Sequence, residues 1–206
     1  LGLRPPPPPD AGDSGGFTFV DVDDTIIEVH GHAKQGAGFG YCGVRGLNAL
    51  LATVTTTGSA PVIVAQRLRK GSCGSPRGAK RLVADALKTV RTLHPADVRP
   101  LLRADSAFYG APTVGAAVRA GAQVSVTVRL DPKVKAAIAT IGEHAWTPIE
   151  YTDAIFDEVS GTWVSRAEVA EVPFTAFSSK TATDRAPGRR VARRIPDFRA
   201  AKKKAA

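Results

Sequence analysis

The nine residues Phe17–Thr25, with the sequence FTFVDVDDT, constrain the fold of this chain more than any other stretch. Their aromatic and β-branched residues are typical of a buried strand. Side chains alternate along a strand, so Asp21 and Asp23 share one face and Asp24 points the other way. Carboxylates crowded at the end of an apolar strand repel each other unless a cation or hydrogen-bond donors are present. The stretch therefore predicts a divalent-metal site, and a strand that simply runs into a polar turn is the alternative.

The charge balance of the chain favours a polyanionic partner. The sequence has 28 Lys+Arg against 19 Asp+Glu over 206 residues, which gives a formal net charge of +9. Nucleic acid is the commonest partner for such a surface. The two cysteines, Cys42 and Cys73, are too few for a disulfide framework, so we expect free thiols in a reducing compartment. No run approaches the ~20 apolar residues of a membrane span, and we expect a cytoplasmic, nucleoid-associated protein.

Composition divides the chain into four parts. Residues 1–16 are rich in Pro and Gly and are expected to be disordered, and residues 197–206 form a basic tail. Residues 17–142 are expected to form the core of an α/β domain, and residues 143–196 a β-rich insertion.

Within the core, the hydrophobic pattern predicts the order β-β-β-α-β-α-β-α. Ser75-Pro76 is expected to start the first helix, which carries apolar residues at helical spacing. Asp131-Pro132 is expected to start the third helix by the same capping logic. Strands are predicted over 17–25, 44–56, 61–69, 98–104 and 123–129, and helices over 75–93, 112–120 and 131–142. Short β segments are predicted over 146–151, 161–164, 171–177 and 189–195.

Two aspartates follow strands of this predicted sheet. Asp23 ends the first strand and Asp105 follows the fourth. In a ribonuclease H-like mixed sheet these two strands are neighbours, so the two carboxylates would meet and hold divalent metal between them. Two such metals activate the attacking oxygen and stabilise the leaving oxygen of a phosphodiester displacement. Asp23 and Asp105 are therefore the expected catalytic residues and metal ligands, with Asp21 as a further metal ligand.

Basic residues lie near these acids in the predicted sheet. Arg67, Arg69 and Lys70 end the third predicted strand, and Arg103 and Arg129 accompany the fourth and fifth. We expect these five residues to contact DNA phosphates, although a solvated strand edge would look the same.

The sequence resembles bacterial insertion-sequence transposases of the DDE type, a branch of the ribonuclease H-like integrase superfamily. The resemblance runs from about Phe19 to Asp197 and is carried by VDVDDT, HGHAKQGAGFGYCGVRGLNALLAT, RLRKGSCGSPRGA, RADSAFYG, SVTVR, AWTPIEY and AEVAEVPFTAF. The D-x-T context of the family matches Asp23, and its R-x-D-S/G context matches Asp105.

The resemblance implies a partner, a cofactor and a reaction. The intact enzyme would hydrolyse transposon-end phosphodiesters and join the freed 3′-hydroxyl to target DNA, using a two-metal site with Mg²⁺ or Mn²⁺. Double-stranded DNA would be the partner, and a homodimer in a synaptic complex is expected. The third acid of the family is a Glu on a helix after the β-rich insertion. Glu143, Glu168 and Glu171 do not match that context, so we expect a chain truncated at both ends and inactive.

Two other functions fit parts of the sequence. Asp21-x-Asp23-x-Thr25 also matches the D-x-D-x-T signature of haloacid dehalogenase-like phosphatases, with Asp21 as nucleophile, Asp23 as general acid and Mg²⁺ beside them. That fold is a doubly wound parallel sheet, and two strands without an intervening helix follow the motif here. A basic, non-catalytic DNA-binding remnant would share the net charge of +9 but would need no metal.

Overall fold

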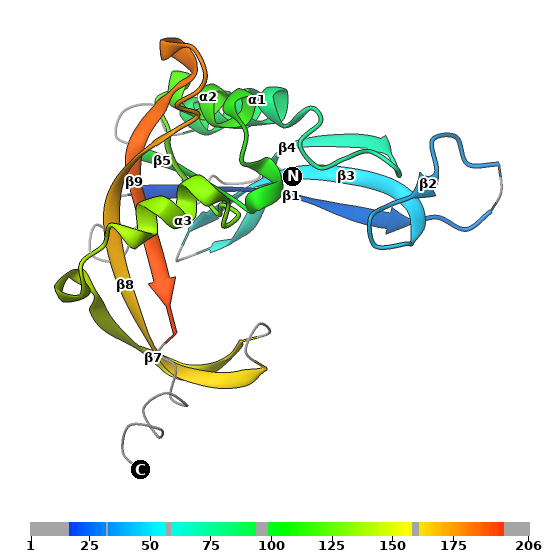
Figure 1. Ribbon diagram of the computed structural model, residues 1–206. Helices are drawn as coiled ribbons and strands as arrows, with labels where there is room; N and C mark the ends of the chain where they lie inside the picture. Colours follow the sequence, from blue (N-terminus) through cyan, green and yellow to red (C-terminus); the bar gives the residue numbers. More distant parts are fainter. Residues whose placement is uncertain (1–16, 32, 57–58, 94–98, 158–160, 196–206) are drawn as a thin grey trace. The chain divides into compact units, whose positions relative to one another are not determined.

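The computed structural model describes residues 17–31, 33–56, 59–93, 99–157 and 161–195 (Figure 1). They form two compact units. The first comprises the chain up to residue 128 together with residues 179–186, and the second comprises residues 129–178 and those from 187 onward. The predicted disordered segment 1–16 and the basic tail 197–206 lie outside the described residues.

The first unit is built on a mixed sheet of six strands. These are β1 (Phe17–Glu28), β2 (Gly38–Phe39), β3 (Arg45–Thr56), β4 (Ser59–Lys70), β5 (Arg99–Ala104) and β6 (Gln123–Val126). The order is β2-β3-β1-β5-β6, and β4 also pairs with β3. β3 runs antiparallel to β1 and β4, whereas β5 and β6 run parallel to β1.

This arrangement is a ribonuclease H-like mixed sheet, as predicted. Three strands joined as antiparallel neighbours are followed by two parallel strands that are reached through helices. The first and fourth predicted strands, β1 and β5, are paired in register from Phe17↔Arg99 to Val22↔Ala104. A haloacid dehalogenase-like fold would need parallel pairing in a doubly wound sheet. Because β1 pairs antiparallel with β3, the phosphatase alternative does not fit this fold.

Two helices cover one face of the sheet. α1 (Ala79–Leu93) joins β4 to β5, and α2 (Ala111–Arg119) joins β5 to β6; the two lie side by side in Figure 1. The apolar stripe of α1 packs on alternate residues of the central strands, which is the burial that an amphipathic helix requires. The core contains Val20, Val22, Leu50, Ala52, Leu102, Leu82, Val83, Ala86, Leu87, Val90, Ala116 and Ala117. No helix in the described part of the chain is both long and apolar enough to cross a membrane.

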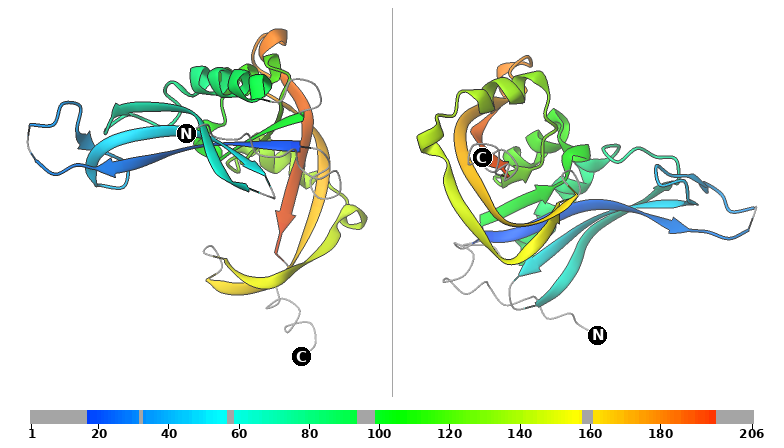
Figure 2. Two further views of the ribbon diagram at one scale, coloured as in Figure 1. Left: turned by 180° about the vertical axis from the view of Figure 1, so that it is seen from behind. Right: turned by 60° about the horizontal axis from the view of Figure 1, so that its bottom comes forward.

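In its described residues, the second unit has a three-stranded sheet and one α-helix. α3 (Pro132–Ala139) begins where Asp131 accepts a hydrogen bond from the backbone N–H of Val134 (2.8 Å), so the predicted cap is confirmed. The sheet has the order β7-β8-β9, and β7 and β8 form a long antiparallel hairpin (Figure 2). The segments predicted at 161–164 and 171–177 are parts of one strand. The strands are β7 (Thr147–Asp157), β8 (Thr162–Ala176) and β9 (Ala186–Arg194).

Candidate active site

Asp23 and Asp105 occupy matching positions on neighbouring parallel strands. The last registered pair of β1 and β5 is Val22 and Ala104, and the two aspartates are the next residues of each chain segment. Adjacent strands lie about 4.8 Å apart. Both carboxylates are exposed to solvent. The register therefore places Asp23, within β1, and Asp105, just after β5, at matching positions of neighbouring strands, and their joint role as metal ligands stays a prediction.

Each of these carboxylates is oriented by a backbone N–H. Oδ1 of Asp23 accepts a hydrogen bond from the N–H of Asp24 (2.8 Å). Oδ1 of Asp105 accepts one from the N–H of Ala107 (2.9 Å) and so caps the short 3-10 helix Ser106–Phe108. Phe108 is 1% exposed and anchors that helix in the core. Within the described residues, Oδ2 of both aspartates has no hydrogen-bond partner, so each carboxylate keeps one oxygen for a ligand.

Asp21 is engaged by protein groups on the same face of the sheet. Its Oδ1 accepts from Nε of Arg103 (2.6 Å), and its Oδ2 accepts from Nη2 of Arg103 and from Oγ1 of Thr55 (2.8 Å each). The Arg103 guanidinium also lies over the ring of Phe19, 4.3 Å from its centroid. Both oxygens of Asp21, predicted as a metal ligand, are thus occupied by hydrogen bonds.

These contacts affect the acidity of both partners. Burial alone would raise the pKa of Asp21, but the hydrogen bonds from Arg103 and Thr55 hold the pKa of this carboxyl below its usual value. The same hydrogen bond to Asp21 raises the pKa of Arg103. The Asp21 carboxylate is therefore ionised and paired at neutral pH, and it holds a guanidinium beside the position of Asp23.

Asp24 points to the opposite, helix-covered face and belongs to a buried polar network. The side chains of Asp24 and Arg69 are 5% and 9% exposed, and they form an ion pair of 3.1 Å. Asn48 donates to Asp24 and accepts from Nε of Arg69 (2.9 Å). Nη1 of Arg69 donates to the carbonyl oxygens of Ser75 (3.0 Å) and Arg77 (2.5 Å). The network fixes the loop after β4 to the strand that carries Asp23.

Strand alternation divides the predicted phosphate contacts between the two faces. Arg67 and Arg69 face the helices: Arg67 is ion-paired with Asp85 of α1, and Arg69 is enclosed in the buried network. Lys70 lies on the other face, which Asp23 shares, and it is exposed. The guanidinium groups of Arg67 and Arg69 already have protein partners, and their contact with DNA phosphates stays a prediction.

Three glutamates of the second unit are also paired with arginines. Arg194 donates to Glu143 (2.7 Å) and Glu168 (2.5 Å), and its guanidinium lies 4.3 Å from the centroid of the Trp146 ring. Glu171 accepts from Arg189 (2.7 Å). The pairs of Glu168 and Glu171 join β8 to β9, and the pair of Glu143 joins the 3-10 helix Glu143–Ala145 to β9.

Two further observations bear on ligands. Among the described residues, no group of three or more His, Cys, Asp or Glu is close enough to hold a metal ion.

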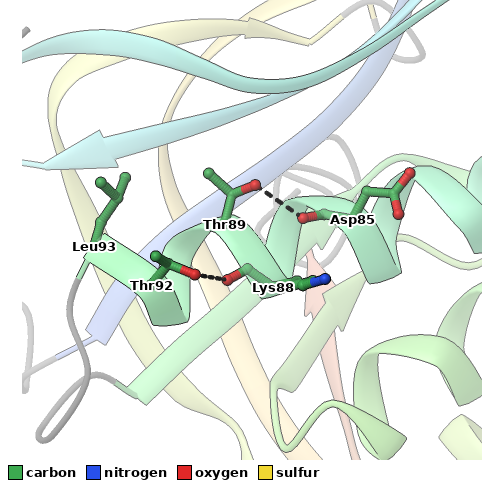
Figure 3. Close-up of a pocket in the computed structure, with 5 residues that line it drawn as sticks. All are labelled: Asp85, Lys88, Thr89, Thr92 and Leu93. Carbon is green, nitrogen blue, oxygen red and sulfur yellow. Dashed lines mark hydrogen bonds between the residues drawn. The ribbon is translucent and has the colours of Figure 1, made fainter.

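An open depression of about 420 Å³ lies along α1, lined by Asp85, Lys88, Thr89, Thr92 and Leu93 (Figure 3). The hydroxyls of Thr89 and Thr92 donate to carbonyl oxygens of their own helix (3.1 and 3.0 Å), so few polar groups remain for a ligand there.

Sequence reasoning missed the role of the buried network. Asn48 interrupts the otherwise apolar pattern of β3. Arg69 lies at a position of β4 that, by strand alternation, faces the helices. Those two signals could have indicated a buried pair, because a polar side chain on a core-facing position needs a partner.

The sequence and the fold were each compared with those of known proteins. The sequence matches the family described as "Transposase DDE domain" over residues 14–190. A solved structure similar to the chain is that of the piggyBac transposase synaptic complex with hairpin DNA, at a TM-score of 0.40 and 12% identity. The match covers 70% of this chain and 36% of that protein. No protein of curated function matches the sequence.

Proposed function

The chain belongs to the transposase DDE domain family, and from this premise we propose that it forms the metal-binding part of a DNA transposase. The proposal is supported by the register of β1 and β5: Asp23 and Asp105 are the residues that follow its last pair, Val22 and Ala104, and each has one carboxylate oxygen available among the described residues. Hard carboxylate oxygens are the ligands that Mg²⁺ and Mn²⁺ accept. The donor set therefore fits the metal of the family.

Asp23 and Asp105 would hold the metal, and Asp21 would act beside them. A bound divalent cation supplies charge stabilisation and an activated oxygen nucleophile for phosphodiester displacement. The backbone N–H groups of Asp24 and Ala107 orient the two carboxylates toward it. Asp21 has both oxygens bonded to Arg103 and Thr55, so we assign it the role of holding Arg103 in place rather than that of a ligand.

DNA would approach on the face of the sheet that Asp23 shares. Arg103 and Lys70 present positive charge on this face, and 43% of the Arg103 side chain is exposed. A guanidinium beside the two acids can bind a phosphate oxygen while Asp21 fixes its orientation. Arg129 follows β6, is exposed, and stays a candidate phosphate contact. A homodimer that brings two DNA ends together is part of the proposal.

The chemistry needs a third carboxylate that the described residues do not gather around the pair. Glu143 and Glu168 are held by Arg194, and Glu171 is held by Arg189, so none of these three is free to serve. We propose that this chain binds metal and DNA but does not complete strand transfer. Strand transfer by the purified chain in Mg²⁺ would contradict this part of the proposal and leave the metal site standing.

Metal binding at the two aspartates can be tested directly. Fe²⁺ bound in place of Mg²⁺ generates hydroxyl radicals that cut the backbone near the ion, and we expect cuts near residues 23 and 105 that excess Mg²⁺ suppresses. Asp23→Asn and Asp105→Asn should each abolish both cuts. Asp153→Asn, at an exposed carboxylate of β7, is the matched control and should leave them unchanged. Cuts that persist in both site variants would overturn the proposal.

The same variants distinguish the proposed metal-dependent enzyme from the alternative, a non-catalytic DNA-binding remnant. If the chain binds DNA equally well with and without Mg²⁺, and if Asp23→Asn changes neither affinity nor metal-directed cleavage, then a non-catalytic role describes it better.

A further inference from the structure

The chain between β1 and β3 forms a projecting arm, which we define as residues 33–46 and which contains β2 (Figure 1). The arm presents two aromatic side chains to solvent: Phe39 is 68% exposed and Tyr41 is 85% exposed. Tyr41 is the most exposed large hydrophobic side chain in the described part of the chain. Neither ring contributes to the core, so packing does not explain them.

The base of the arm is packed too closely to admit side chains. A methyl group at Gly71 would lie 2.0 Å from the carbonyl oxygen of Gly46 and 2.3 Å from that of Gly38. A methyl group at Gly46 would lie 2.3 Å from the carbonyl oxygen of Ile27. The N–H of Gly71 also donates to the carbonyl of Gly36 (3.0 Å). Glycine is needed where backbones approach this closely, and the contacts fix the arm to β1, β3 and the loop after β4.

The arm therefore presents its rings from a rigid support. The turn that carries Tyr41 is closed by two backbone hydrogen bonds, from Gly40 to Val44 (3.0 Å) and from Gly43 to Gly40 (3.1 Å). A backbone that is already fixed in the free protein loses little conformational freedom on binding, which favours a binding role for the side chains that it carries.

The charged residues around the arm indicate which class of partner it binds. Among the described residues on or beside the arm, Lys34, Arg45 and Lys70 are basic and Glu28 is acidic. Exposed aromatic rings next to cationic side chains are the combination that binds single-stranded nucleic acid, because bases stack on the rings while phosphates pair with the cations. A second copy of the chain is disfavoured in a symmetric contact, because its arm would carry the same positive charge.

We propose that Phe39 and Tyr41 form a stacking site for unpaired DNA bases, with Lys34 and Lys70 on the phosphates that flank them. The site lies farther along β1 than Asp23, since Glu28 at the end of the strand is five residues from Asp23 and a strand rises about 3.3 Å per residue, which gives roughly 17 Å. The inference rests on the proposed function only in taking DNA as the ligand. It adds a contact for single-stranded DNA that Asp23 and Asp105 do not provide.

The test measures binding of the full chain to oligonucleotides in EDTA, so that the metal site does not contribute. Stacking on one aromatic residue is worth about 1–3 kcal/mol per base. Tyr41→Ala and Phe39→Ala should therefore each weaken binding of single-stranded DNA by about 5- to 100-fold, whereas binding of a fully paired blunt duplex should change less than about twofold. Tyr41→Trp should keep the affinity. A 2-aminopurine base in the single strand should be quenched by the wild-type chain and not by Tyr41→Ala.

Two control variants separate stacking from other effects. Val118→Ala removes apolar surface from α2, where the side chain is 52% exposed. It should change neither the affinity for single-stranded DNA nor the affinity for duplex DNA. Lys34→Ala should weaken binding of single-stranded and duplex DNA alike, because a phosphate contact does not distinguish them. Both aromatic side chains are exposed, so the variants should keep the wild-type circular dichroism spectrum and unfolding temperature.

Three outcomes decide the inference independently of the metal site. An unchanged ratio of single-strand to duplex affinity in Tyr41→Ala would overturn it. So would a dimer that dissociates in Tyr41→Ala, as seen by light scattering, because the arm would then bind a second copy. Loss of single-strand affinity in Tyr41→Ala that persists in an Asp23→Asn background would support the arm even if the metal-directed cleavage test fails.

Discussion

At the residue scale, the three aspartates of β1 have different roles because their neighbours differ. Asp21 accepts three hydrogen bonds from Arg103 and Thr55, and Asp24 is enclosed with Arg69 and Asn48. Asp23 receives only a backbone N–H within the described residues. A metal ligand needs oxygen atoms that protein donors do not already occupy, so under the proposed function Asp23 is the residue of the three expected to bind metal.

The buried ion pair of Asp24 and Arg69 should contribute strongly to stability. Removing one partner of a buried pair leaves an uncompensated charge, which costs about 3–5 kcal/mol. Arg69→Ala should lower the free energy of unfolding by that amount in urea denaturation. Arg67→Ala is the matched control on the same strand: its ion pair with Asp85 is 39% and 47% exposed, and such pairs are worth about 0–1 kcal/mol. Equal losses in the two variants would contradict the assignment.

The ion pair of Asp21 should make stability depend on pH in a defined direction. The folded-state pKa of Asp21 lies below the ordinary value of 3.8, so its contribution is present above about pH 4 and is lost as the pH falls through the folded-state pKa. At pH 7 Asp21→Asn should be less stable than wild type by roughly 1 kcal/mol, as expected for a partly exposed pair. The difference should shrink toward zero when unfolding is measured down to pH 2. A difference that grows on acidification would contradict the pairing.

At the scale of elements, the pairing of β1 with β5 and the cover of α1 determine where the site lies. The parallel register ends at Val22 and Ala104, which places the next residue of each strand side by side. α1 covers the face that carries Val20 and Val22 and leaves the face of Asp23 for ligands. The same alternation that buries the core therefore exposes the acid.

Helix α1 should be essential to this arrangement. Leu87 is fully buried between the helix and the sheet, and truncating such a leucine costs about 2–5 kcal/mol. Leu87→Ala should lower the free energy of unfolding by that amount. It should weaken metal binding only in proportion to the fraction of protein that is unfolded. Leu93→Ala on the same helix removes a side chain that is 44% exposed and should cost less than about 0.5 kcal/mol. Chemical denaturation of both variants measures the difference.

The sequence allowed the strands and helices of the core to be predicted because their burial is periodic. β1, β3, β4, α1 and β5 lie close to the predicted ranges. The predicted start of α1 at Ser75-Pro76 is wrong: the helix begins at Ala79, and the carbonyl oxygens of Gly74, Ser75 and Arg77 accept from Arg69 instead. Local capping patterns do not reveal a partner that is distant in sequence.

Residue roles were harder to predict for the same reason. Three acids within four positions look equivalent in the sequence, and Arg67, Arg69 and Lys70 look like one basic cluster. Their partners come from other strands and from α1, so their roles follow from the sheet register and not from the local motif. Strand alternation alone correctly predicted that Asp21 and Asp23 share a face and that Asp24 points away.

At the scale of the whole molecule, a net charge of +9 is combined with acids gathered at one site. The positive charge favours a polyanion at long range, and the exposed pair Asp23 and Asp105 would repel the same polyanion locally. A divalent cation between the two acids removes this conflict. The proposed function therefore predicts that the chain binds DNA most tightly when metal is present.

This balance predicts how DNA affinity responds to salt and to single lysines. Each phosphate contact contributes about −0.9 to the slope of log K against log salt, so duplex affinity should fall steeply between low and physiological salt. Lys70→Ala should reduce the magnitude of that slope by about 1, because Lys70 lies on the face of Asp23. Lys88→Ala, at an exposed lysine on the helix-covered face, should leave it unchanged. Fluorescence anisotropy across a salt series measures both slopes, and a larger effect for Lys88 would place the DNA on the helices instead of on the face that carries Asp23.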